Sequence, residues 1–347
     1  MLTFDVAMPL TLFLVTLAAL LLSKRVEGKL KSTLEEREFR TRDTILLVVL
    51  VAVAVFVVVF IPEMALIALF MFSYASLLFT FSYLFSAVNK KQALLFISAF
   101  FVSSLIVGVV ALLGIFRGNF MFYWGLAACG LAVFTFSALL LELRKVRSGG
   151  RWYLAVLPPA LFIIVFFAFS STPLWFPFLF DTFGIVFAIL ITLYLSSLFT
   201  WKTTFVFAAL LTVIDFILVL VIPVMEPAAT HIANLGLPVL IYMPVIPPIF
   251  NANAIFGLQP LALGLGDFFF AGTLATQTYK KFGKRTAIIS AITMSVAFGV
   301  FEILLLNTEF GAFPGTLMII LGWLPVVAWK MVSEKKTKNN VNVGTKV

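Results

Sequence analysis

Two aspartates of this 347-residue chain lie inside long apolar runs, where a carboxyl group is energetically unfavourable. Asp215 occurs in "LLTVIDFILVLVIP" and Asp267 occurs in "LALGLGDFFFAG". A charged side chain in the centre of a bilayer costs roughly 2.5–3.5 kcal/mol, even on the most lenient insertion scale. Because that energy is lost unless the side chain has a use, we expect both aspartates to be functional.

A pair of carboxyl groups can hydrolyse a peptide bond without help from other groups. Two carboxyl groups a few ångströms apart in a low-dielectric site cannot both ionise, so one keeps its proton. The ionised member can activate a water, while the protonated member donates a hydrogen bond to the carbonyl oxygen. The chain has one histidine, His231, and one cysteine, Cys129, so HExxH zinc chemistry, a cysteine metal site and a disulfide framework lack their residues. We expect no cofactor and no metal.

The composition indicates a membrane protein. Hydrophobic residues make up 63% of the chain and charged residues only 11%, which is more apolar surface than one soluble core can hide. Membrane topology explains the net charge of +9 better than nucleic-acid binding does. We therefore expect an all-α polytopic membrane protein, in contact with lipid, in which residues 1–347 form a single integral membrane domain.

Eleven apolar stretches are long enough to cross about 30 Å of hydrocarbon. They lie near residues 7–22, 44–61, 64–88, 92–115, 121–143, 152–171, 177–199, 203–225, 258–279, 286–307 and 313–331. Residues 1–202 form an N-terminal group of helices, residues 203–331 contain both aspartates, and residues 332–347 form a basic tail.

The basic residues predict the orientation of these spans. With eleven spans they gather on one side, and only Arg117 falls on the other. These residues are Lys24 to Arg42, Lys90–Lys91, Arg144–Arg151, Lys202, Lys280–Arg285 and the stretch from Lys330 onward. The positive-inside rule makes that side cytoplasmic, so the N-terminus lies outside the cell membrane and the C-terminus inside.

The two aspartates lie at similar depth. Asp215 and Asp267 are on consecutive helices of opposite direction and are each about nine to twelve residues from both helix ends, roughly 14–18 Å deep. They can therefore face one another near the middle of the bilayer. Asp181 and Glu302 lie closer to the outer ends of their helices, and we expect them to reach the interface and to be structural.

Other functions are compatible with acids at the midplane. A proton- or cation-coupled transporter or channel would use the same two aspartates as ligands, and it predicts flux along a gradient without peptide products. A hydrogen-bonding pair between packed helices, or an inactive membrane scaffold, is a further alternative.

The surrounding residues resemble a known family. The segment Gly264-Leu265-Gly266-Asp267 resembles the GxGD motif of the presenilin and signal peptide peptidase family of intramembrane aspartyl proteases, in its prokaryotic or archaeal form. The preceding helix carries Ile214-Asp215 where the family has Tyr-Asp. In "FPGTLMII", Pro314-Gly315-Thr316-Leu317 occupies the place of the family's Pro-Ala-Leu, and Thr316 departs from leucine. The resemblance covers about residues 203–331.

This resemblance implies a presenilin-like helical bundle with nine core spans and two extra ones. It implies an aspartic endopeptidase in which Asp215 and Asp267 are catalytic and the segment around Pro314 helps to form the site. The orientation matches signal peptide peptidases, so the implied substrates are remnant signal peptides or type II transmembrane segments, with no obligatory subunit and the oligomeric state open. Prepilin-type peptidases also use GxGD, but the Pro314 motif and the number of spans disfavour them.

A segment before the GxGD motif could bind the substrate. "LGLPVLIYMP" resembles the stretch in this place in the family, and its β-branched and aromatic residues between prolines favour a strand. We hypothesise that Pro238, Val239, Leu240, Ile241 and Tyr242 pair with an unwound substrate by strand addition. Deleting residues 237–243 should then abolish cleavage and leave the fold. The alternative is an interfacial re-entrant loop.

Overall fold

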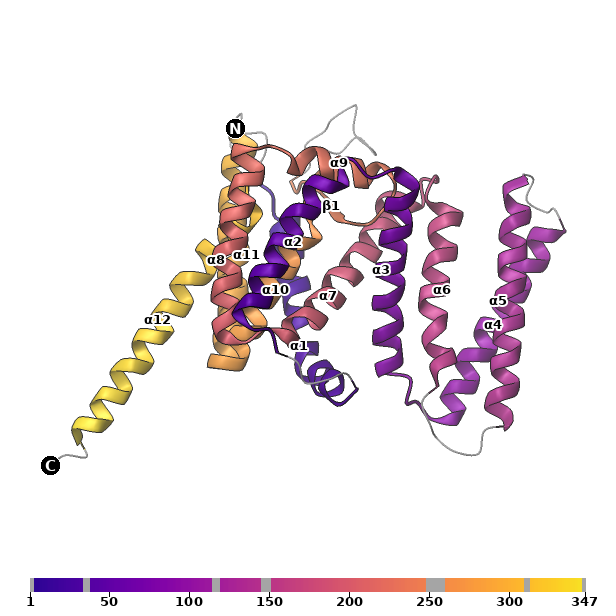
Figure 1. Ribbon diagram of the computed structural model, residues 1–347, viewed down its shortest axis with the longest axis horizontal. Helices are drawn as coiled ribbons and strands as arrows, with labels where there is room; N and C mark the ends of the chain where they lie inside the picture. The colour runs from indigo at the N-terminus through magenta and orange to yellow at the C-terminus, as the bar shows by residue number, and fades with distance from the viewer. Residues whose placement is uncertain are drawn as a thin grey trace. The chain divides into compact units, whose positions relative to one another are not determined.

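The computed structural model describes residues 3–33, 38–113, 119–144, 151–247, 260–308 and 313–344, and these residues are mostly helical (Figure 1). The elements are α1 (Ala7–Thr33), α2 (Thr41–Val58), α3 (Glu63–Leu84), α4 (Lys90–Leu112), α5 (Asn119–Arg144), α6 (Trp152–Phe169), η1 (Trp175–Leu179), α7 (Phe180–Leu198), α8 (Trp201–Phe216), η2 (Ile217–Val221), α9 (Met225–Asn234), β1 (Leu240–Pro244), β2 (Pro260–Gly264), α10 (Leu265–Phe282), α11 (Lys284–Asn307) and α12 (Gly315–Gly344).

Each of the eleven apolar stretches expected to span the membrane coincides with a helix. Ten helices among the described residues are long and apolar enough to cross a membrane, which indicates a multi-pass membrane protein. The exception among the eleven is α10, and its position in the bundle explains why.

Helix α10 is surrounded by other helices. It packs against α1, α7, α8, α11 and α12, and every residue from Phe268 to Thr278 is buried. Because protein rather than lipid surrounds it, the helix can carry polar side chains such as Thr273, Thr276 and Gln277. The expected span that is not apolar enough to cross a membrane by itself is therefore one surrounded by protein.

The chain divides into two compact units. One contains Met1–Leu66 and Pro177–Val347, and the other contains Ile67–Phe176. Within the second unit α4 and α5 pack closely where Gly108 lies against Cys129 and Gly125 lies against Ala111, so small residues allow the two backbones to approach. Both aspartates belong to the first unit.

The expected helix at 258–279 begins later than predicted. Residues 260–264 form strand β2, which pairs antiparallel with β1 from Leu240 opposite Gly264 to Pro244 opposite Pro260, and α10 begins at Leu265. Residues 258–259 lie outside the described part. A short apolar run does not distinguish a strand from a helix, which is why the boundary was wrong. The strand predicted in "LPVLIYMP" is confirmed as β1.

Two further boundaries differ from the prediction. Regular α8 ends at Phe216 and continues as the π-helical turn η2, so Asp215 lies near the end of α8 rather than in its middle. Single π turns inside helices are frequent at functional sites. Helix α12 continues to Gly344, so the described part of the basic tail predicted at 332–347 is helical.

Candidate active site

Three helices of the first unit bring the predicted site residues together. Helices α8, α10 and α12 all contact one another. Asp215 lies thirteen residues after Lys202, and Asp267 lies thirteen residues before Lys280. Because the end of α10 lies at the start of α8, the two helices run in opposite directions, and both carboxyl groups lie about 20 Å along the helix axis from the basic end. Their equal depth in a membrane stays a prediction.

Asp215 is buried and hydrogen-bonded to the start of α12. Its side chain is 6% exposed. The Thr316 hydroxyl donates a hydrogen bond to Asp215 Oδ2 at 2.6 Å, and the Thr316 backbone N–H donates to the same oxygen at 3.2 Å. Thr316, which looked like a departure from a family motif, thus supplies two hydrogen bonds to one of the two aspartates.

Asp267 lies in the first turn of α10, next to Gly315, which precedes Thr316 in α12. Its carboxylate accepts a hydrogen bond from the Gly264 backbone N–H. A Cβ atom placed on Gly315 would lie 2.5 Å from Asp267 Oδ1 and 2.8 Å from its Cγ. A side chain at position 315 would therefore require the Asp267 carboxylate to move from this position.

The two carboxyl groups form a pair without a cation. Asp215 and Asp267 interact electrostatically, and no ion pair to either one occurs in the part of the chain that the structure describes. Among those residues no cluster of three or more His, Cys, Asp or Glu could hold a metal ion. Two like charges that close favour a state in which the pair keeps one proton.

One side of Asp267 is open. The residue is only partly buried, and the neighbouring Gly266 is exposed with nothing within 4 Å of a Cβ placed on it. A Cβ placed on Gly264 would lie 3.3 Å from Asp267 Oδ2, whereas the space beside Gly266 is open.

Strand β1 lies between β2 and α7, so both of its edges are occupied. The Tyr242 N–H donates to Asp181 Oδ1 at 2.7 Å, and Leu240 O lies against Gly184 of α7. Because the Tyr242 N–H points to α7, its partner Ala262 is in a non-hydrogen-bonded pair, and the backbone of Ala262 faces away from β1. Among the residues that the structure describes, no backbone hydrogen bond is made at the outer edge of β2.

The predicted docking residues also support the fold. The Leu265 N–H donates to Val239 O at 3.0 Å, which satisfies one free amide at the start of α10. Pro238 and Ile241 are buried. Deleting residues 237–243 would remove this contact and the pairing with β2, so we now expect the deletion to disturb the fold as well as cleavage.

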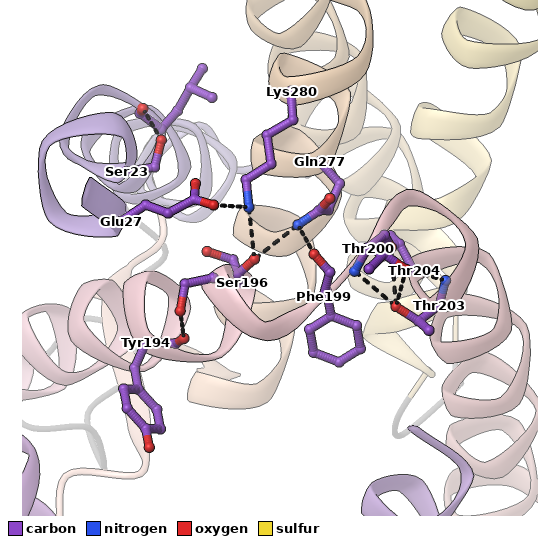
Figure 2. Close-up of polar contacts among 12 residues, drawn as sticks. Ser23, Glu27, Tyr194, Ser196, Phe199, Thr200, Thr203, Thr204, Gln277 and Lys280 are labelled. Atoms are coloured by element: carbon purple, nitrogen blue, oxygen red, sulfur yellow. Dashed lines mark hydrogen bonds and ion pairs between the residues drawn. The ribbon is translucent and has the colours of Figure 1, made fainter. Parts of the chain in front are cut away.

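The opposite end of α10 is held by polar side chains (Figure 2). Gln277 Nε2 donates to Ser196 O at 2.8 Å and to Phe199 O at 2.9 Å, where α7 ends and α8 is about to begin. Lys280 Nζ donates to Ser196 O at 3.3 Å and forms an ion pair of 3.0 Å with Glu27 of α1. These contacts fix the axial position of α10, and with it Asp267, relative to the start of α8. Sequence analysis missed Gln277, although a buried amide in an apolar helix is a signal for such a contact.

The two acids expected to be structural differ from each other. Asp181 binds the backbone of β1, as described above, which is a structural role. Glu302 is 5% exposed, and its Oε2 has no hydrogen-bond partner among the described residues. Its position at the membrane interface stays a prediction. Glycine packing explains its burial, because Gly299 one turn earlier lies against Pro9 of α1.

No family model and no curated protein sequence matches the chain. The resemblance to GxGD proteases therefore rests on the short sequence motifs alone. Of the motif residues, Gly264, Gly315 and Thr316 contact the aspartates. Leu317 instead donates its N–H to Pro314 O at 3.2 Å, within its own turn.

Proposed function

We propose that the protein is an intramembrane aspartyl peptidase of the GxGD type. The observation that carries the proposal is the contact of one dipeptide with both carboxyl groups: Gly315 lies against Asp267 and Thr316 hydrogen-bonds Asp215. Such an arrangement fixes the position of two acids that share a proton, as general acid–base hydrolysis requires.

The contacts suggest a role for each aspartate. Two hydrogen bonds from Thr316 favour the charged form of Asp215, which then removes a proton from the attacking water. Asp267 gives its proton to the carbonyl oxygen, so that a gem-diol forms. The diol then collapses: one diol hydroxyl gives its proton to Asp267, the carbon–nitrogen bond breaks, and the leaving amine takes the proton of Asp215. Asp215 is then ionised and Asp267 protonated, as at the start.

The substrate helix must unwind before its carbonyls can react. Strand addition remains our mechanism for holding the unwound segment, but the edge of β2 replaces the edge of β1 as the partner. Ala262 and Gly266 are exposed on the approach to Asp267. The variant Ala262→Pro tests this step, because proline removes the outward N–H without removing a bond to β1. We expect cleavage to fall about tenfold, since one or two backbone hydrogen bonds are lost.

The proposed substrates are remnant signal peptides or type II transmembrane segments. This choice follows from the distribution of basic residues, which makes the Lys202 and Lys280 end cytoplasmic. The proposal includes no obligatory subunit.

The test is cleavage of a synthetic signal-peptide-like transmembrane peptide by the purified protein in detergent. In water enriched in ¹⁸O, we expect two fragments by mass spectrometry, with one ¹⁸O in the new carboxyl terminus. No fragments from several peptides, with the protein folded, would contradict the proposal. A proton or cation flux in liposomes would then support the alternative, a transporter or channel that uses the same two aspartates.

A further inference from the structure

A groove lies at the basic ends of the three helices that carry the proposed active site. Its volume is about 240 Å³. It is lined by Trp201 of α8, Lys281 and Phe282 of α10, and Met331, Glu334 and Lys335 of α12. All six residues belong to the first unit, and the groove lies outside the aspartate site. Thr316 and Lys335 are on one helix, about 28 Å apart along its axis.

The lining has an apolar wall and a charged rim. The rings of Trp201 and Phe282 pack edge to face at 5.2 Å. Lys281, Glu334 and Lys335 are all exposed, and in the described part of the chain neither lysine takes part in an ion pair. Lys280, the neighbour of Lys281, is instead engaged with Glu27. Two lysines and one glutamate give the groove a net charge of about +1.

We propose that this groove binds the headgroup of an anionic phospholipid of the surrounding leaflet, with a phosphodiester between Lys281 and Lys335. A basic groove between transmembrane helices suits a lipid phosphate, and tryptophan is favoured at the level of the headgroups. The net charge matches a headgroup that carries one negative charge. A hydroxyl of a glycerol headgroup can donate to Glu334, which favours phosphatidylglycerol over phosphatidylcholine.

The headgroup would join α10 to α12. Because Gly315 and Thr316 at the start of α12 contact the aspartates, a lipid that holds the other end of α12 against α10 should stabilise the site. This consequence for activity rests on the proposed function, whereas lipid binding itself does not. The two are therefore measured separately.

Binding is tested by native mass spectrometry of the full chain in detergent, with equal amounts of phosphatidylglycerol and phosphatidylcholine. We expect preferential retention of one phosphatidylglycerol, and a loss of affinity of about fivefold for each lysine changed to glutamine, or about 25-fold for Lys281→Gln with Lys335→Gln. The matched control is Lys91→Gln with Lys284→Gln, which removes the same charge from two other exposed lysines and should retain the lipid. Lys281→Arg with Lys335→Arg should also retain it.

Three results would overturn the proposal. These are equal retention of both lipids by the unchanged protein, equal loss in the control pair, and displacement of the lipid by millimolar glycerol 3-phosphate, which would indicate a site for a soluble phosphate. Thermal unfolding without lipid checks that the variants are folded. If binding follows the prediction but peptide cleavage is never seen, the groove stands and the proposed function fails.

Discussion

Two regions of the molecule bury carboxylates in opposite ways. In the second unit, Glu142 of α5 is 0% exposed, and its Oε1 accepts hydrogen bonds from Arg151 Nε at 3.0 Å and Nη2 at 2.8 Å. The Tyr153 hydroxyl donates to its other oxygen, and Arg151 Nη1 donates to Val88 O at 2.6 Å. Every charge in this cluster has a partner, and the cluster joins α5, α6 and the segment before α4.

The first unit places Asp215 and Asp267 together with no cation. Their partners are a hydroxyl, backbone amides and each other. A buried ion pair with all its hydrogen bonds made is inert and holds elements in register. Two acids without a cation can exchange protons with a bound molecule. In these two sites the carboxylates are all in the protein interior, but only Glu142 has a partner cation in the described part of the chain. The presence of that cation, rather than burial, distinguishes the structural carboxylate from the candidate catalytic pair.

Removing the positive charge of Arg151, the partner of Glu142, should have the largest effect on stability. In Arg151→Gln the Glu142 charge stays buried without its partner, which costs about 3–5 kcal/mol. Thermal unfolding in detergent measures it, with Lys91→Gln as the exposed control. The double variant Glu142→Leu with Arg151→Met should recover most of the loss. An unchanged unfolding midpoint in Arg151→Gln would contradict the comparison.

Gly315→Ala should have the next largest effect, on activity rather than on stability. The new Cβ would meet Asp267 Oδ1 at 2.5 Å, so the carboxylate must rotate away from its position. A displacement of about 1 Å lowers catalysis by roughly 10²-fold. Gly28→Ala is the matched control, because nothing lies within 4 Å of its Cβ position. Equal cleavage by Gly315→Ala and Gly28→Ala would show that cleavage does not depend on the contact between Gly315 and the Asp267 carboxylate.

Thr316→Val should lower cleavage by about tenfold, because it removes the hydroxyl that donates to Asp215 and keeps the backbone N–H. Thr316→Ser restores the donor and should retain most of the activity. The rate of fragment formation from one transmembrane peptide measures both variants. Equal rates in Val and Ser variants would indicate that Thr316 serves only packing.

Two variants of Asp181 test the role of a carboxylate whose partner is a backbone amide, the N–H of Tyr242. Asp181→Leu leaves the Tyr242 N–H without its acceptor, so faster hydrogen exchange at that amide is expected. Asp181→Asn keeps an acceptor oxygen and should protect the amide. We expect about a fivefold loss of cleavage in the leucine variant only, since β1 supports β2 and α10. Unchanged exchange in Asp181→Leu would show that α7 does not hold β1.

The sequence predicted the helices and the pair of aspartates because hydropathy and charge are local properties. Apolar runs predicted eleven spans, and ten described helices are long and apolar enough to cross a membrane. The distances of Asp215 and Asp267 from the basic ends predicted that the two residues lie at the same level. Antiparallel neighbours preserve that match even where a helix boundary is wrong. The expectation of nine core spans with two extra ones stays a prediction.

Contacts between distant segments could not be predicted. Strand β2 was assigned to a helix because "LALG" is apolar in either conformation. Arg151 was counted only among the basic residues that predict orientation, because its ion pair with Glu142 depends on how α5 and α6 pack. Thr316 was judged against a family motif, whereas its role depends on the position of Asp215.

The most direct test of the central claim compares peptide cleavage by four proteins in equal folded amounts: the unchanged chain, Asp215→Asn, Asp267→Asn and Glu142→Gln. We predict that each aspartate variant loses cleavage by about 10³-fold or more while its unfolding midpoint is not lowered. Glu142→Gln should lose stability and, when folded, retain cleavage. Cleavage by either aspartate variant at the rate of the unchanged chain would contradict the assignment of Asp215 and Asp267 as the catalytic pair.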